Sequence, residues 1–321
     1  MGRAVAVALA VVLLSVTGCQ GASTLAGPPP TAVPSAEAAQ PPLDPSEPRP
    51  ASVSASAPVT APTSMAPPGG AATAGPGPPA PADARALGAE LARVEVALRE
   101  PATPAADLPA MGLAQQVGYR QLAANPGWRP EVLRAVPASL HGAVVANAEA
   151  EALLASMHKR RPTTLPAWRI VAPPPAPTVL AAHQAAGKEI GVDWPVLAAI
   201  HLVETRMGRI RGTSTAGAKG PMQFLPATWG QYGAGGDIED LTAASRAAAR
   251  LLKRNGIDRD PRSAVWSYNH SYAYVDAVLA YAATMRADQR AFLGYHGWQV
   301  FYRHADGDVL LPEGWGFPLR P

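Results

Sequence analysis

Glu204 combines a carboxyl group with an apolar setting, which is the combination that acid–base catalysis needs. Asp193 is a helix-capping residue type and Pro195 fits a first helical turn, so the sequence predicts a helix from Trp194 to about Met207. At about 100° per residue, Glu204 falls inside the apolar arc of this helix. The apolar members of the arc are Val196, Leu197, Ile200, Val203 and Met207. Burial raises the pKa of a carboxyl group, so the pattern predicts a general acid.

Two plainer interpretations of Glu204 stay open at this stage. The carboxylate could pair with a nearby arginine, or the helix could be phased so that Glu204 faces water. The candidate partners are Arg206, Arg209 and Arg211. His201 lies at the edge of the same arc, and we interpret it as a core or cleft residue rather than a proton donor.

A loop rich in glycine follows the predicted helix and leads into a short helix near Pro226. Glycines let the backbone approach a ligand closely, and Gln223 adds an amide donor and acceptor beside it. Further along the chain, Tyr268 and Asn269 place a phenol and a second amide at the end of another helical stretch. The sequence therefore offers one carboxyl group and several neutral polar groups.

Three motifs in this order resemble the catalytic domain of lytic transglycosylases, which are lysozyme-like enzymes that cut peptidoglycan. They are Glu204-Thr-Arg-Met-Gly, Ser214 to Thr228 with its Gly-Pro-Met-Gln-Phe core, and Ala264 to Ser271 with its Tyr-Asn pair. The wider similarity covers about 166–288, a little over a third of the chain. The second and third motifs are most similar to the membrane-bound lytic transglycosylase B type in its actinobacterial lipoprotein form.

The resemblance implies a mainly α-helical, lysozyme-like fold and a mechanism with one carboxyl group. Glu204 would protonate the glycosidic oxygen between N-acetylmuramic acid and N-acetylglucosamine, aided by the muramic acid's own substituents. It would then act as base on the C6 hydroxyl, giving a 1,6-anhydro product without consuming water. The substrate-binding residues that the resemblance implies are Ser214, Met222, Gln223, Tyr268 and Asn269.

Each of these residues has an implied role. Gln223 and Asn269 would hydrogen-bond the sugars or their N-acetyl groups, and Met222 would form an apolar wall. Tyr268 would lie close to Glu204 and help hold it. Ser214 would either contact the substrate or shape its loop. Trp229 and Trp266 could stack on sugar faces, although we interpret both as packing residues.

Two competing functions are considered. A hydrolytic lysozyme of the goose type would share the fold and the acid, but it needs a second carboxylate to position water. The nominated acids are Asp237, Glu239 and Asp240. A non-catalytic wall-binding lipoprotein is the other alternative, and the presence of Glu204 and the Tyr-Asn pair argues against it.

No metal, cofactor or nucleic acid is expected from the sequence. Relatives often carry a D-x-D-x-D-G calcium loop after the second motif, whereas this chain has Gly-Gly-Asp-Ile-Glu-Asp at 235–240. The seven histidines show no metal-ligand spacing. A net charge of +3 without a basic-aromatic cluster does not indicate nucleic-acid binding.

The N-terminal part of the sequence is typical of an exported lipoprotein. Residues 1–18 have a charged start and a short apolar run, which predict a signal peptide. Cys19, the single cysteine, ends a lipobox-like Val-Thr-Gly-Cys and is the predicted lipid attachment site, placing the protein on the outer face of the membrane. Within the linker 19–82, residues 27–81 hold 17 of the 36 prolines and predict a disordered tether.

Three further regions follow the linker. Residues 83–165 are predicted to form a helical module with helices from Asp83, over 108–122 and over 138–157. The catalytic domain is assigned to 166–290, with helices over 179–190, 241–252, 261–268 and 272–285. In the extension 291–321, apolar segments flanking Ala-Asp-Gly-Asp predict a short hairpin that covers the catalytic domain. The basic run His158-Lys-Arg-Arg161 is interpreted as a solvated helix end rather than a patch for anionic polymers.

Overall fold

The computed structural model describes residues 72–157 and 161–316. The predicted signal peptide, the lipid attachment site Cys19 and most of the linker lie outside these residues. Within the described part, the fold is mainly helical, with eleven α-helices and two short strand pairs, which confirms the predicted class. None of the helices in the described part is long and apolar enough to span a bilayer.

The N-terminal helices are α1 (Ala84–Arg99), α2 (Leu108–Ala124), α3 (Arg129–Ala135) and α4 (His141–Ser156). The predicted start of α1 is confirmed, because the Asp83 carboxylate accepts the backbone N–H of Ala86 at 2.8 Å. The helix predicted over 138–157 begins instead as a 3₁₀ turn at Ala138–Leu140 and becomes α-helical at His141. The sequence pattern did not predict α3.

The central helices are α5 (Ala176–Ile190), α6 (Trp194–Thr205), α7 (Pro226–Tyr232), α8 (Leu241–Arg254), α9 (Pro261–Tyr268) and α10 (Tyr272–Ala287). The prediction for α9 matches its bounds, and the others agree to within a few residues at one or both ends. Three of these helices begin with a side-chain cap, because Asp240, Asp260 and Ser271 each accept a backbone N–H from the first turn.

Helix α6 differs from the prediction in two respects. The apolar arc described only part of the buried surface, because every residue from Pro195 to Thr205 is buried and α6 packs against α5, α8, α10 and α11. Asp193 does not cap it, because its carboxylate pairs with the Arg286 guanidinium of α10 at 2.6 Å. The ion pair joins the start of α6 to α10 instead.

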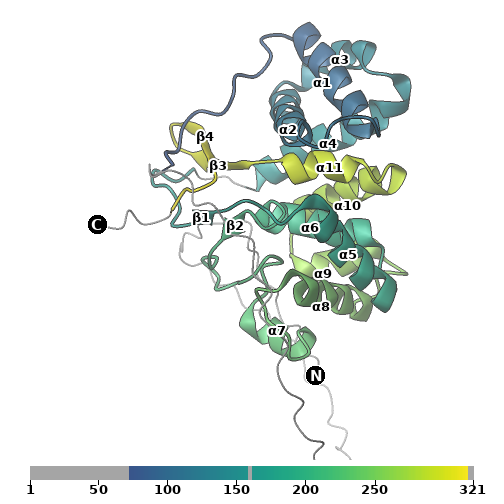
Figure 1. Ribbon diagram of the computed structural model, residues 1–321, viewed down its shortest axis with the longest axis vertical. Coiled ribbons are helices and arrows are strands. Elements are labelled where there is room, and N and C mark those ends of the chain that lie inside the picture. The colour runs from purple at the N-terminus through teal and green to yellow at the C-terminus, as the bar shows by residue number, and fades with distance from the viewer. Residues whose placement is uncertain (1–71, 158–160, 317–321) are drawn as a thin grey trace, which may run out of the picture. The chain divides into compact units, whose positions relative to one another are not determined.

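Helix α11 (Ala291–Gly297) and α10 lie between the N-terminal helices and α5–α9 (Figure 1). Gly112 of α2 allows the close crossing with α11, since a Cβ there would stand 2.4 Å from the Gly294 carbonyl oxygen. Trp298 follows α11 and donates its indole N–H to Gln115 of α2 at 2.9 Å. One apolar core is therefore continuous from α1 to Trp298.

Two antiparallel strand pairs complete the described part. The predicted hairpin is confirmed as β3 (Val300–His304) and β4 (Gly307–Leu311), with Val300 opposite Leu311. The second pair, which was not predicted, joins β1 (Arg169–Ile170) to β2 (Ile210–Arg211). Gly75 adds to the outer edge of β4 by two hydrogen bonds with Leu310, at 2.8 and 3.2 Å. The prediction of a disordered tether over 27–81 is therefore wrong for the end of that segment, because this contact fixes it to the hairpin.

Candidate functional site

Helix α6 ends abruptly one residue after Glu204. Arg206, Met207 and Gly208 all adopt left-handed backbone conformations, with φ of 52°, 59° and 84°. Two of them are not glycine, and such residues cost about 1–3 kcal/mol each unless the surroundings impose them. The helix therefore stops at Thr205 rather than at Met207, and Glu204 stands in its last turn.

The Glu204 carboxyl group is buried and has one protein partner. Glu204 is 5% exposed, and its Oε1 accepts a hydrogen bond of 2.7 Å from the O–H of Tyr274 on α10. Oε2 is buried and has no hydrogen-bond partner among the described residues. Because Oε1 already accepts a hydrogen bond, the proton of the neutral acid is placed on Oε2.

Burial sets the protonation state of Glu204. Loss of hydration raises the pKa of this carboxyl group to about 8, and the hydrogen bond from Tyr274 opposes the rise because it favours the ionised form. The group is therefore largely protonated at neutral pH. A carboxylic acid with an unpartnered, protonated oxygen can donate its proton to an acceptor such as an ether oxygen.

The two plainer interpretations of Glu204 are wrong. No arginine in the described part forms an ion pair with it: Arg206 donates to the Leu202 carbonyl and Arg209 to the His296 carbonyl. Arg211 approaches Glu239, at 3.9 Å. Exposure to water is excluded by the burial of the residue. The carboxyl group is therefore neither neutralised by a cation nor solvated.

Thr205 joins the end of α6 to the loop 214–225. Its hydroxyl donates to the Pro221 carbonyl at 2.7 Å and accepts the N–H of Gly208 at 3.1 Å. Further along, Lys219 and Phe224 exchange two backbone hydrogen bonds of 2.9 Å, which closes the turn that contains Gln223. Glu204 and this turn are thus fixed to each other by the neighbouring hydroxyl.

Gln223 stabilises its own turn. The residue has a φ of 50° and is mostly buried, and its side-chain N–H groups donate to the Gly220 carbonyl at 2.9 Å and the Gly212 carbonyl at 3.4 Å. Ser214 shapes the start of the loop, because its hydroxyl accepts the N–H of Ala218 at 3.0 Å. Of its two implied roles, the contacts among the described residues favour the structural one.

Tyr268 lies close to Glu204, as the resemblance implies, but its hydroxyl group bonds a different partner from the one expected. It lies near enough for the charge of Glu204 to add to the burial that raises its pKa, but its O–H donates to the Met222 carbonyl. The tyrosine that hydrogen-bonds Glu204 is Tyr274. Met222 is completely buried in the core, and its backbone carbonyl accepts the hydrogen bond from Tyr268.

Asn269 ends α9 with an unfilled donor. The residue is buried, and its side-chain Nδ2 has no hydrogen-bond partner among the described residues. An unpaired buried amide costs free energy, so such a group suits a ligand carbonyl.

The two tryptophans have different surroundings. Trp229 packs its ring on Phe224, with 5.5 Å between the ring centroids, while Trp266 is 37% exposed and lies edge-on to His270.

Two buried histidines lie behind the carboxyl group. His201, three residues before Glu204, is hydrogen-bonded through Nδ1 to His183 Nε2 at 3.1 Å, and Ser245 Oγ lies 3.1 Å from His183 Nδ1. Burial lowers the pKa of His183 to about 3 and that of His201 well below its ordinary value. Both are therefore neutral near pH 7, which confirms the interpretation of His201 as a core residue.

The three loop acids nominated for hydrolysis have other contacts. Asp237 accepts the N–H of Glu239 at 2.9 Å, and Asp240 accepts the N–H of Ala243 at the start of α8 at 2.7 Å. All three are exposed. Among the described residues, no group of three or more His, Cys, Asp or Glu could hold a metal ion.

Tyr274 is the site residue that the sequence interpretation missed. It shares one face of α10 with Val278, Tyr281 and Met285, at spacings of a buried helical stripe. A tyrosine in such a stripe needs a partner for its hydroxyl, and Glu204 is one of three buried polar residues on the mostly apolar α6, with His201 and Thr205. A search for polar residues without a local partner on the apolar faces of two different helices would have suggested that Tyr274 and Glu204 form a pair.

Replacing Tyr274 with phenylalanine should raise the pKa of Glu204 further, because a hydrogen bond to the ionised form is lost. The alkaline limb of a pH–rate profile should then move up by as much as about one unit, and the rate should fall about tenfold because the acid is held less well. Tyr281→Phe is the matched control, since its hydroxyl bonds Glu151 instead. If the alkaline limb of the Tyr274→Phe profile stays at the same pH or moves to a lower pH, the assignment of Tyr274 as the hydrogen-bond partner of Glu204 is contradicted.

Comparisons with protein-family models, curated proteins and solved structures give no match for this chain. The geometry around Glu204 and the three sequence motifs are the features that point to a function.

Proposed function

We propose that this chain is a peptidoglycan lytic transglycosylase with a lysozyme-like catalytic region, cleaving the β-1,4 bond between N-acetylmuramic acid and N-acetylglucosamine. The observation that carries the proposal is the Glu204 carboxyl group. It is buried, protonated at neutral pH, held at Oε1 by Tyr274 and unpartnered at Oε2. The three motifs support the same reaction class.

In the first step, Glu204 Oε2 donates its proton to the glycosidic oxygen as the bond from that oxygen to C1 of the muramic acid breaks. The departing sugar leaves as an alcohol, and positive charge develops at C1. The 2-N-acetyl group of the muramic acid assists its departure. Tyr274 keeps its hydrogen bond to Oε1 and stabilises the carboxylate that forms.

In the second step, the C6 hydroxyl of the same muramic acid attacks C1 and gives its proton to Glu204. The buried carboxylate is a strong base because burial raises its pKa, so proton return is favourable. The C6 oxygen is held close to C1 within one sugar ring, which gives it a high effective concentration. The acid is regenerated, the 1,6-anhydro ring closes and no water is consumed.

Neutral polar groups would bind the sugars. The unpaired Asn269 Nδ2 suits the carbonyl oxygen of an N-acetyl group. Met222 and Gln223 belong to the turn that Thr205 ties to α6, and Tyr268 of α9 is hydrogen-bonded to the Met222 carbonyl of that turn, so their positions are linked to that of Glu204. Ser214 supports this turn through its loop.

The direct test is digestion of purified peptidoglycan by the full chain. The wild type should release soluble muropeptides and Glu204→Gln should not. A non-catalytic wall-binding protein would bind the polymer and release nothing. A hydrolytic lysozyme would release products with reducing ends, although each nominated loop acid is exposed and Asp237 and Asp240 bond neighbouring backbone.

The protein is proposed to act at the outer face of the membrane, held by lipid on Cys19, with the proline-rich sequence before residue 72 as its tether into the wall. Replacing Cys19 with alanine should therefore move the enzyme from the membrane fraction into the soluble envelope fraction or the medium, with activity retained. Membrane fractionation and the mass of the N-terminal peptide measure this. Unchanged fractionation with an unmodified wild-type peptide would overturn the lipid anchor.

A further inference from the structure

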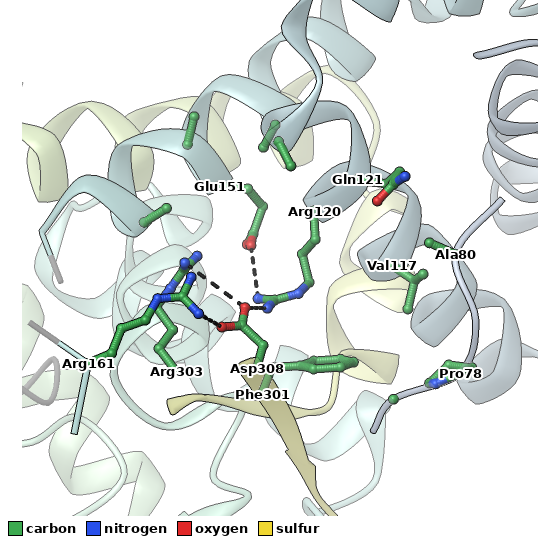
Figure 2. A pocket seen from close by; sticks show the side chains of 15 residues that line it. Pro78, Ala80, Val117, Arg120, Gln121, Glu151, Arg161, Phe301, Arg303 and Asp308 are labelled. Atoms are coloured by element: carbon green, nitrogen blue, oxygen red, sulfur yellow. Dashed lines mark hydrogen bonds and ion pairs between the residues drawn. The ribbon is translucent and has the colours of Figure 1, made fainter. Parts of the chain in front are cut away.

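A pocket of about 460 Å³ lies away from Glu204, and it shares no residue with the site described above (Figure 2). Its walls come from α2, α4, the β3–β4 hairpin and the segment 77–80, just after the strand contact of Gly75 with Leu310. The volume falls in the range of small-molecule sites, which is about 300–1,000 Å³. With Arg161, which also lines the pocket, five separate segments of the chain therefore surround a space large enough for a ligand.

Three guanidinium groups gather at this pocket around one aspartate (Figure 2). Arg120 of α2 forms a hydrogen-bonded ion pair with Asp308 of β4. Arg161 lies 3.1 Å from the same carboxylate, and Arg303 of β3 lies 4.0 Å from it. One carboxylate is thus shared by three cations.

The second carboxylate of the pocket is committed to other partners. Glu151 accepts the O–H of Tyr281 at 2.9 Å and lies 3.7 Å from Arg120. Three guanidinium groups against two carboxylates leave one positive charge in the pocket. The described residues therefore lack one anion that would balance the cluster.

Arg303 is the guanidinium group of the pocket that lies farthest from its carboxylate partner. Its side chain is 23% exposed, and its 4.0 Å approach to Asp308 is the one ion-pair contact it has within the described residues. Burial lowers its pKa; the charges of Asp308 and Glu151 oppose this, whereas those of Arg120 and Arg161 act in the same direction as burial. A mostly buried guanidinium with open donors is costly unless an acceptor binds to it.

Apart from Gln121, the remaining walls are apolar, and most of their side chains are small. Phe301 lies beneath the Arg120 guanidinium, 4.5 Å from it, and Val117, Ala124, Ala152 and Ala155 contribute methyl groups. A ligand that fits this surface carries one negative charge beside small apolar groups. A planar carboxylate also matches the forked geometry of guanidinium donors.

We propose that this pocket binds the free C-terminal carboxylate of a short peptide with small side chains, with Arg303 and Arg161 as its principal donors. Arg161 belongs to the basic run that the sequence suggested was only a solvated helix end; its side chain is 43% exposed and faces the pocket in Figure 2. Residues 158–160 of that run lie outside the described part of the chain. The inference does not depend on the reaction at Glu204.

The test is a ligand-observed NMR titration of the full chain with tri-alanine and with tri-alanine amide, which differs by the carboxylate alone. The acid should bind with millimolar or tighter affinity, and the amide at least about tenfold more weakly. Arg303→Gln and Arg161→Gln should each weaken binding of the acid at least about tenfold while leaving that of the amide unchanged. Arg134→Gln is the control, because its side chain is 76% exposed and lies outside the pocket.

Each outcome decides the proposal. Equal affinity for the acid and the amide would overturn the carboxylate proposal. No binding of the acid at a concentration of about 20 mM, which is 20-fold above the weakest expected dissociation constant of about 1 mM, would also overturn it. If inorganic phosphate binds more tightly than tri-alanine and the same variants abolish this, the carboxylate assignment is wrong. Should Arg303→Gln fail to fold, judged by its thermal transition, the more exposed Arg161→Gln gives the decision. Peptidoglycan cleavage is measured separately, so failure here leaves the proposed reaction untouched.

Discussion

Replacing Glu204 with glutamine should reduce peptidoglycan cleavage at least about 10²-fold while the protein stays folded. The amide has nearly the same shape and can still accept the Tyr274 hydrogen bond at Oε1. It cannot deliver a proton to the leaving oxygen or take one back from the C6 hydroxyl. The measurement is the initial rate of muropeptide release at fixed enzyme concentration.

The same substitution should make the protein more stable at neutral pH. The pKa of Glu204 is about 8 in the folded state and close to 4.5 in the unfolded chain. Between these values the folded state holds a proton that the unfolded state has lost, so wild-type stability falls as pH rises from about 4.5 to 8. Glutamine does not titrate, and at pH 7 the variant should gain about 2–3 kcal/mol in free energy of unfolding.

Denaturant unfolding at several pH values measures this gain. The difference between the two proteins should be small near pH 4.5, grow towards pH 8 and then stay constant. Glu189→Gln, on the exposed face of α5 and paired with Arg246, is the matched control and should change neither rate nor stability by much. A folded Glu204→Gln with a near-normal rate would remove Glu204 from the mechanism, and a stability difference that does not depend on pH would contradict its burial.

Replacing Gly220 with alanine should damage both stability and cleavage. Gly220 has a φ of 76°, and a Cβ there would stand 2.0 Å from the backbone oxygen of Ile238. The left-handed conformation costs about 1–2 kcal/mol for alanine, and the overlap forces two loops apart at a further cost of about 1–3 kcal/mol. Pro221 and Gln223 would then shift relative to Thr205. We expect a loss of about 3 kcal/mol and at least a tenfold lower rate.

Gly217→Ala separates the two causes. Gly217 has a similar φ of 85°, but the space around its Cβ position is open. Its substitution should therefore cost only the conformational part, about 1 kcal/mol, and leave the cleavage rate within a few-fold of wild type. Equal losses in the two variants, measured by thermal unfolding and by muropeptide release, would show that contact with Ile238 does not position the turn.

Much of the fold could be predicted because its elements carry local signals. Asp83 caps its helix as predicted, although the side chain of Asp193 does not, and the Asp-Gly between β3 and β4 marks the hairpin. The end of α6 could not be predicted in this way, because Arg206 and Met207 adopt left-handed conformations that their residue types disfavour. Tertiary contacts impose that ending, and no local pattern encodes it.

The candidate site was predicted in part for a related reason. Helix periodicity placed Glu204 among apolar side chains, and burial agrees with that, although α6 is buried on all sides rather than along one arc. The hydrogen-bond partner depends on how α10 packs on α6, which is long-range information. Spacing within one helix therefore located the acid, whereas the choice between Tyr268 and Tyr274 needed the three-dimensional arrangement.

The pocket between α2, α4 and the hairpin illustrates the same limit. Arg120, Arg161, Arg303 and Asp308 are separated by up to 188 residues and show no common motif. Each alone is an ordinary surface charge in the sequence. The packing of α11 on α2 through Gly112 brings the hairpin that carries two of them against the N-terminal helices.

The central claim is that one buried carboxyl group cleaves the glycan without water, and the masses of the first products test it most directly. Purified peptidoglycan digested by the full chain should yield muropeptides that lack a reducing end and weigh one water less than those from a hydrolytic lysozyme. Muropeptides with reducing ends, dominant from the earliest time points and absent with Glu204→Gln, would contradict the account and show that water attacks C1.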